Sequence, residues 1–228
     1  MVTSRKMLRF YWMDNFKPVT YFWSILLLVD ILQIVGQHYF SEILGRSDVF
    51  WFSANFGAIA IYLLVYGILI ATNSFPLMMS FGIPRQRFYL SVIGTTAILC
   101  AAMALIQNIV VYGGYGLTSL LGHTIEESIP AFFPLWYSQF AFYLFDMFLF
   151  ILLGTVFYRF GTLPGLITIA FYVLILNLSP GSMDLAENFE LSAPGLSNVM
   201  VSHLFLGLSV LLIVIGWLLY RHAPVRTY

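Results

Sequence analysis

The sequence predicts an all-α integral membrane protein with six transmembrane helices. Of its 228 residues, 61% are hydrophobic and only 9% are charged, whereas a soluble domain is roughly one quarter charged. The apolar residues also gather into six segments, five of them long enough for the ~20 residues that a helix needs to cross a bilayer core. The segments are 19–37, 50–72, 88–112, 135–158, 163–178 and 199–220.

The whole chain, residues 1–228, is expected to form one membrane domain without catalytic residues. It contains no G-x-x-x-x-G-K-[ST] phosphate loop, so we expect no ATP hydrolysis by this chain itself. Paired Cys/His spacings and an H-E-x-x-H motif are also absent, and Cys100 is the single cysteine, so we expect no metal site, no cofactor and no internal disulfide. The net charge of zero argues against a nucleic-acid partner.

Residues 4–16, ahead of the first span, have the pattern of a helix lying in the membrane interface. At 100° per residue the apolar and the basic side chains fall on different sides of such a helix. The alternative is a frayed basic tail. Pro18 then breaks the chain before the first span. The apolar set is Met7, Leu8, Tyr11 and Trp12, and the basic set is Arg5, Lys6 and Arg9.

The basic residues predict the orientation of the spans. With the N-terminus in the cytoplasm, nine of the ten Lys and Arg residues lie inside and only Arg46 lies outside, as the positive-inside rule requires. An even number of spans also returns the C-terminus to the cytoplasm. The inside set is Arg5, Lys6, Arg9, Lys17, Arg85, Arg87, Arg159, Arg221 and Arg226.

The fifth apolar segment, 163–178, is short for a span. It runs into residues 179–198, a partly apolar stretch that two Pro-Gly pairs interrupt. Irregular backbone is tolerated at membrane depth only where protein or water covers it. The pattern therefore predicts either a broken, re-entrant segment in the outer leaflet or a plain exposed loop.

Two carboxylates lie inside predicted spans, Asp30 in the first and Asp146 near the middle of the fourth. An ionisable group there costs ~2.5–3.5 kcal/mol on insertion scales, so each should face protein or water. Either the two residues line a translocation pathway or a proton relay, or they make polar packing contacts between spans. Possible partners for such contacts are Gln33, Gln107 and Asn108.

The connector 73–87 between the second and third spans carries the most functional information. It offers apolar side chains on a stretch too short to span, then Gly82 and Pro84 as breakers, then two arginines at headgroup level. We expect either a short helix parallel to the membrane that docks on a cytoplasmic partner, or an ordinary basic loop. The candidate docking residues are Phe75, Met78, Met79, Phe81, Gly82, Arg85 and Arg87.

Residues 80–89, SFGIPRQRFY, resemble the small–aromatic–Gly–Ile/Val–Ser–Arg–x–x–Phe pattern of ABC-transporter permeases of the type-2 exporter class. The layout is also similar: a basic N-terminal helix, six spans, a broken external segment before the last span, and the basic tail WLLYRHAPVR. The chain differs from the family at Pro84, where Ser or Thr is more common. Its compactness is most similar to small bacterial permeases that export peptides, such as exporters of phenol-soluble modulins or those giving bacteriocin immunity.

The resemblance implies a half-transporter in the bacterial cytoplasmic membrane that exports an amphipathic peptide or another amphiphile. Two permease subunits, identical or different, would each sit on a separate ATPase that holds ATP and Mg²⁺. Residues 73–84 would be the coupling helix that docks on the ATPase, and residues 4–16 the interfacial connecting helix.

Two other classes of function stay open from the sequence. One is an ion-coupled secondary carrier or channel that works through Asp30 and Asp146. The other is a membrane-embedded assembly or sensor subunit with no transport of its own.

Overall fold

A computed structural model of the chain describes residues 17–33, 35–36, 51–120, 131–168, 170 and 199–221. The predicted interfacial helix 4–16 and the predicted re-entrant segment 179–198 lie outside these residues, as does most of the fifth predicted span. The described part is helical except for the turn at residues 81–84 and the single residues 131 and 161, and it contains no strand.

The described elements follow one another as helices joined by short turns. The named elements are α2 (Trp51–Leu69), the π-helix η1 (Ile70–Ser74), α3 (Phe75–Ser80), α4 (Arg85–Leu120), α5 (Phe132–Phe160) and α8 (Val199–Arg221). Residues 17–33 and 162–168 are helical as well. Four stretches are long and apolar enough to cross a bilayer: Asn55–Ser80, Arg85–Leu117, Phe132–Phe160 and Val199–Arg221. The chain is therefore a multi-pass membrane protein, and these four stretches correspond to the second, third, fourth and sixth predicted spans.

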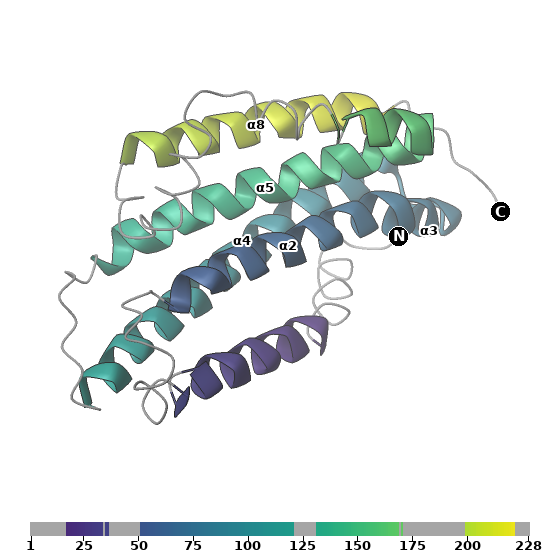
Figure 1. The fold of residues 1–228 in the computed structure, drawn as a ribbon. Helices are drawn as coiled ribbons and strands as arrows, with labels where there is room; N and C mark the ends of the chain where they lie inside the picture. The colour runs from purple at the N-terminus through teal and green to yellow at the C-terminus, as the bar shows by residue number, and fades with distance from the viewer. Residues whose placement is uncertain are drawn as a thin grey trace.

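Helix α5 lies in the middle of the bundle. Figure 1 shows α8 along one side of it and α2 and α4 along the other. The helix of residues 17–33 flanks α2 and α4, because Phe22 stacks against Tyr62 of α2 and the indole of Trp23 donates a hydrogen bond to the sulfur of Met103 in α4. Each of the other described helices in the bundle thus packs against α5 or against a helix next to it.

Helices α2 and α5 approach each other closely where both carry glycine. A Cβ atom added at Gly154 would lie 2.9 Å from the Cβ of Ala71 and 3.0 Å from the Cα of Ile68. A Cβ atom added at Gly67 would lie 3.1 Å from the backbone nitrogen of Ile151. Because lipid gives helices no hydrophobic reason to associate, van der Waals contact of this kind is what holds them together.

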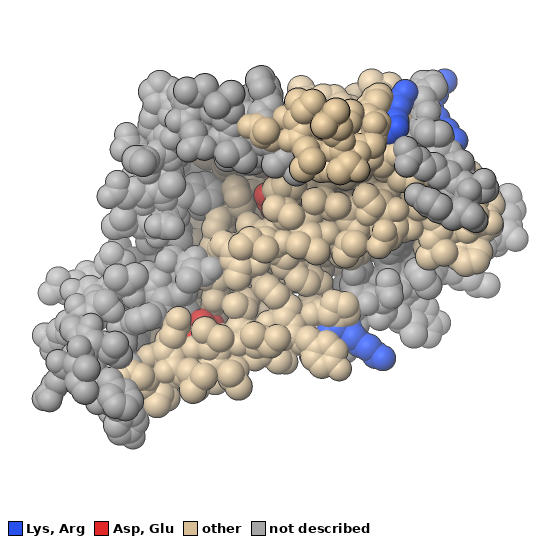
Figure 2. Space-filling model, turned by 45° about the vertical axis from the view of Figure 1, so that its right-hand side comes forward, with Lys and Arg blue, Asp and Glu red and all other residues tan. Residues whose placement is uncertain are grey.

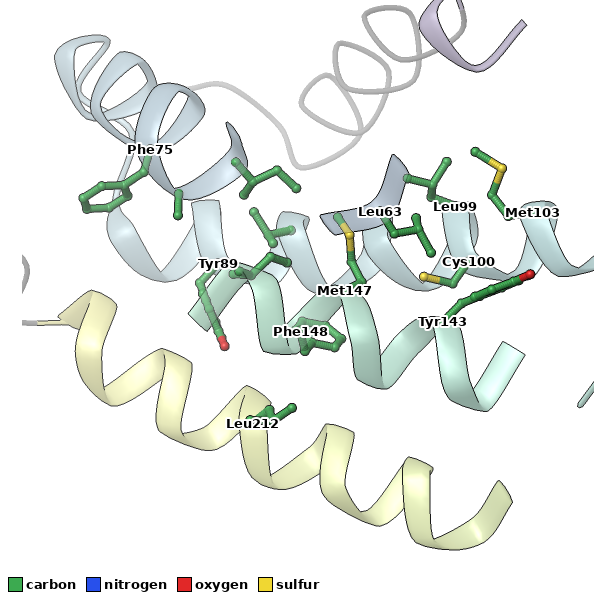
Figure 3. Close-up of a cluster of buried hydrophobic side chains, with 14 of the residues drawn as sticks. Leu63, Phe75, Tyr89, Leu99, Cys100, Met103, Tyr143, Met147, Phe148 and Leu212 are labelled. Atoms are coloured by element: carbon green, nitrogen blue, oxygen red, sulfur yellow. The ribbon is translucent and has the colours of Figure 1, made fainter. Parts of the chain in front are cut away.

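The core fills the space between α2, α4 and α5 with methionine and aromatic side chains (Figure 3). Met103 and Met147 are fully buried there, beside Cys100 and Tyr143. Flexible thioethers fit irregular gaps between helices. The core is thus continuous from α4 across α5, and Leu212 extends it onto α8.

The connector between the second and third spans is shorter than the predicted 73–87. The helix of α2 continues through η1 and α3 as far as Ser80, and α4 begins at Arg85, so only residues 81–84 form the turn. Pro76 explains the π-helix, because proline has no N–H and would clash with a carbonyl one turn back in a regular α-helix. Helix α3 is thus the last part of the candidate span Asn55–Ser80, continuous with α2 and η1, and not the separate short helix that the connector predicted.

The turn itself is a Schellman motif. The backbone N–H of Gly82 donates to the carbonyl of Met79, and that of Ile83 donates to the carbonyl of Met78. Gly82 has φ +71°, a left-handed conformation that glycine adopts without a steric penalty. Pro84 then precedes α4, and its carbonyl accepts the N–H of Phe88. The sequence therefore encodes both the end of one helix and the start of the next.

Candidate functional site

One end of the bundle is basic. Arg85 and Arg87 begin α4, Arg159 lies in the last turn of α5 and Arg221 ends α8. We call this the basic end. Figure 2 shows the blue Lys and Arg atoms toward one side of the molecule, while red atoms appear only as small spots in a tan surface. The described acidic residues, Asp30 and Asp146, lie within helices, away from this end.

The candidate docking residues of the connector divide into a buried and an exposed set. Phe75 is fully buried and Met78 is 5% exposed, so both belong to the core. Met79 is half-buried against that core. Phe81 is 69% exposed, and Leu77, which the sequence reasoning left out, is 48% exposed. A partner at this end would therefore meet Leu77 and Phe81, while Phe75 and Met78 hold α3 in place.

Phe75 joins α3 to three other helices through ring contacts. Its ring centroid lies 5.5 Å from that of Phe88 in α4, 5.4 Å from that of Tyr158 in α5 and 4.9 Å from that of Tyr220 in α8. All three contacts are edge-to-face, the arrangement that aromatic quadrupoles favour. We call Phe75, Phe88, Tyr89, Tyr158, Trp217 and Tyr220 the basic-end aromatic cluster.

Two hydrogen bonds fasten α4 to α8 beside this cluster. The guanidinium of Arg85 donates to the terminal-turn carbonyl of Arg221 over 2.5 Å, and the hydroxyl of Tyr89 donates to the carbonyl of Ile213 over 2.6 Å. Figure 3 shows the Tyr89 hydroxyl pointing toward α8. Gly216 makes room for it, because a Cβ atom there would lie 2.5 Å from the hydroxyl oxygen. Arg87 is exposed, and Gly82 is exposed in the turn.

Sequence reasoning missed Tyr89, Gly216 and Tyr220 as parts of this end. Tyr220, near the end of the last predicted span, is 1% exposed. The available signal was the repetition of tyrosine and tryptophan near the same ends of the third, fourth and sixth spans. That repetition is typical of interface anchors, so it does not by itself reveal inward-facing rings.

Asp30 makes a polar packing contact between helices. The side-chain amide of Asn55 in α2 donates to its Oδ2 over 2.8 Å, and both residues are buried. The partner is therefore Asn55, which the sequence reasoning did not consider, and none of the three predicted partners. Of those three, Gln107 and Asn108 are buried in α4, where the Asn108 amide donates to the carbonyl of Phe132 over 3.4 Å.

Asp146 has no such partner. It is 7% exposed in the middle of α5, and its buried Oδ2 accepts no hydrogen bond from the described part of the chain. Cys100 of α4 and Tyr143 of its own helix are buried in the same bundle core. Neither is a cation. The structure thus shows different surroundings for two carboxylates that the sequence pattern did not distinguish.

No family model, curated protein or solved structure matches the chain. Among the residues that the structure describes, no three His, Cys, Asp or Glu side chains gather into a set that could hold a metal ion. The features of the molecule that carry functional information are therefore the basic end and the buried carboxylates.

Proposed function

We propose that this chain is the transmembrane subunit of an ATP-driven exporter, powered by a separate cytoplasmic ATPase. The observation that carries the proposal is the construction of α3. Leu77 and Phe81 stand exposed at the basic end, while Phe75 on the same short segment contacts α4, α5 and α8. A partner that pushes on the exposed pair would move the ends of three spans together.

The charge distribution supports a cytoplasmic position for this end. The described Arg residues gather there, and the positive-inside rule assigns such an end to the cytoplasm. Both termini would then be cytoplasmic, in the bacterial plasma membrane that the sequence resemblance implies. An ATPase would meet Leu77, Phe81 and Arg87 directly, because all three are exposed.

The proposed mechanism is a shift between two arrangements of the spans. ATP binding would favour a closed pair of ATPases, and that closure would displace α3 in each of two permease subunits. A ligand shifts such an equilibrium only through its different affinity for the two states. The basic-end aromatic cluster would pass the displacement to α4, α5 and α8, and an amphipathic peptide or similar amphiphile would leave on the outer side.

The test is Phe81→Asp, made in the full chain together with its ATPase. Phe81 is 69% exposed, so the change should leave folding and membrane insertion intact. We expect loss of ATPase co-purification and at least a tenfold loss of ATP-dependent export into inverted vesicles. Met78→Asp is unsuitable, because Met78 is buried and a charge there would disrupt the core.

The matched control is Gln86→Asp, which adds the same charge at another exposed position of the basic end. It should retain co-purification and export. If Phe81→Asp behaves like this control, the docking role of α3 is wrong. Export that persists in vesicles without nucleotide would instead favour the ion-coupled alternative, with Asp146 as its residue because Asp30 is bonded to Asn55.

A further inference from the structure

We propose that Asp146 is a binding site for the primary ammonium group of a cationic amphiphile, built between α2, α4 and α5. As a cargo site it rests on the proposed export function, whereas the binding itself requires no ATPase. The ligand class follows from three features: a carboxylate oxygen without a described donor, a row of further acceptor oxygens, and aromatic rings beside them.

The acceptors lie along one stripe of α5. Gln139, Tyr143 and Asp146 are spaced four and three residues apart, which places them on the same face of a helix over two turns. Tyr143 shows where this face points: its ring stacks on Phe56 of α2 at 5.2 Å, and Figure 3 shows it beside Cys100 of α4. The stripe therefore faces the junction of three helices and not the lipid.

Each residue of the stripe leaves an oxygen without a donor among the described residues. The atoms are Oε1 of Gln139, the hydroxyl of Tyr143 and Oδ2 of Asp146. Gln139 is 2% exposed and Tyr143 is fully buried. On α4, Oδ1 of Asn108 is in the same situation, although its amide nitrogen is bonded to Phe132. Unsatisfied acceptors at membrane depth are costly, since lipid supplies no donors.

The described basic residues cannot supply the missing donors. Four of them lie at the basic end, and the fifth, Lys17, opens the first described helix and is exposed. The first described helix is instead tied to α2 through Asp30 and Asn55. No described Lys or Arg therefore neutralises Asp146, and a cation that pairs with it comes from outside the described residues.

Phe142 lies one helical turn before Asp146 on α5, and aromatic rings on the same turns as a carboxylate favour an ammonium over a bare metal ion. Phe56 lies 5.2 Å from Tyr143 and 4.8 Å from Phe142, and Phe205 of α8 lies 5.5 Å from Phe142, between ring centroids. Ring faces attract ammonium groups, and a carboxylate accepts their N–H donors. The apolar tail of an alkylammonium ligand would pack among the Met and Phe side chains of the core.

The experiment measures the thermal unfolding of the full chain in lipid nanodiscs as a function of added probe. The probe is hexylammonium chloride, and the matched neutral compound is 1-hexanol. Sodium chloride at the same ionic strength tests a free inorganic cation. A ligand that binds only the folded state raises the unfolding temperature in proportion to its occupancy, so the concentration dependence gives an apparent dissociation constant.

We expect hexylammonium to raise the unfolding temperature more than hexanol or sodium does. Asp146→Asn should weaken the apparent affinity by at least about tenfold, because it removes the charge, while Asp30→Asn should leave it unchanged. Asp146→Asn should fold, since it keeps the shape and removes a charge that no described residue pairs with.

Two results on the wild-type protein, and one comparison with Asp146→Asn, would overturn the proposal. Equal responses to hexylammonium and hexanol would show that the charge is not recognised, and a response to sodium alone would replace the ammonium with a metal ion. Equal responses of the wild type and of Asp146→Asn would move the site elsewhere. None of these outcomes bears on α3, so the export proposal would stand or fall separately with Phe81→Asp.

Discussion

The basic end of the bundle and the Gln139, Tyr143 and Asp146 stripe of α5 differ in how their polar side chains are paired. At the basic end, Arg85 and Tyr89 both donate to carbonyls of α8, and the rings of Phe75 and Tyr220 close the space between them. On the stripe, Oδ2 of Asp146 accepts no hydrogen bond from the described part of the chain. The hydrogen bonds at the basic end join helices to one another, whereas Oδ2 of Asp146 remains able to accept a hydrogen bond from a ligand.

This difference suggests a division of labour along the helices. The hydrogen bonds of Arg85 and Tyr89 and the ring contacts of Phe75 join the helices at the basic end, which suits the transmission of force from a partner. Unsaturated acceptors cost free energy in the folded state, and such sites are expected where a ligand completes them. Substitutions can test whether the two regions differ energetically as described.

The largest effect is expected from Phe75→Ala. The substitution removes a fully buried ring that contacts three helices and leaves a cavity at their junction. We expect a loss of about 3–5 kcal/mol in the free energy of unfolding. Thermal and denaturant unfolding in nanodiscs would measure it.

The control for that variant is Phe81→Ala, on the exposed side of the same connector. It should change the free energy of unfolding by less than about 0.5 kcal/mol. Equal losses in the two variants would show that Phe75 does not hold the basic end together.

An intermediate effect is expected from Asp30→Ala. The substitution leaves the buried amide of Asn55 without its acceptor, which should cost about 1–3 kcal/mol. Asn55→Ala in the same background should then add little, because the interaction is already absent. A double-mutant cycle on unfolding free energies measures this coupling, and simple additivity would refute a paired Asp30.

A smaller effect than that of Asp30→Ala is expected from Tyr89→Phe. It keeps the ring contacts with Trp217 and Tyr220 and removes only the hydroxyl that donates to Ile213. The expected loss is about 0.5–1.5 kcal/mol. Unfolding measurements on Tyr62→Phe, whose ring also lies beside another tyrosine, provide the comparison. A larger loss in Tyr62→Phe would contradict the importance assigned to the Tyr89 hydroxyl.

Long apolar runs predicted four of the spans well. The predicted 88–112, 135–158 and 199–220 lie within the helices Arg85–Leu120, Phe132–Phe160 and Val199–Arg221. The structure extends the first two helices at both ends: polar and glycine residues continue α4, whereas Phe132, Phe133 and Pro134 open α5 and Arg159 and Phe160 close it. The breaker residues Gly82 and Pro84 also predicted the position of the turn correctly.

The facing of side chains in the connector could not be predicted. The π-helical turn at Ile70–Ser74 changes the rotation of the helix that follows it. As a result, Met78 faces the core and Leu77 does not. Likewise, Asn55 lies far from Asp30 in sequence, and only the packing of two helices brings them together. A contact between two single polar residues produces no periodic pattern in the sequence, so the sequence does not predict it.

The central claim is that this chain works with a separate ATPase, and co-purification tests it most directly. The full chain would be purified gently from its native host, and the accompanying proteins identified by mass spectrometry. The account predicts a stoichiometric soluble chain that carries a phosphate-binding loop. Recovery of this chain alone, under conditions that preserve other membrane complexes, would contradict it.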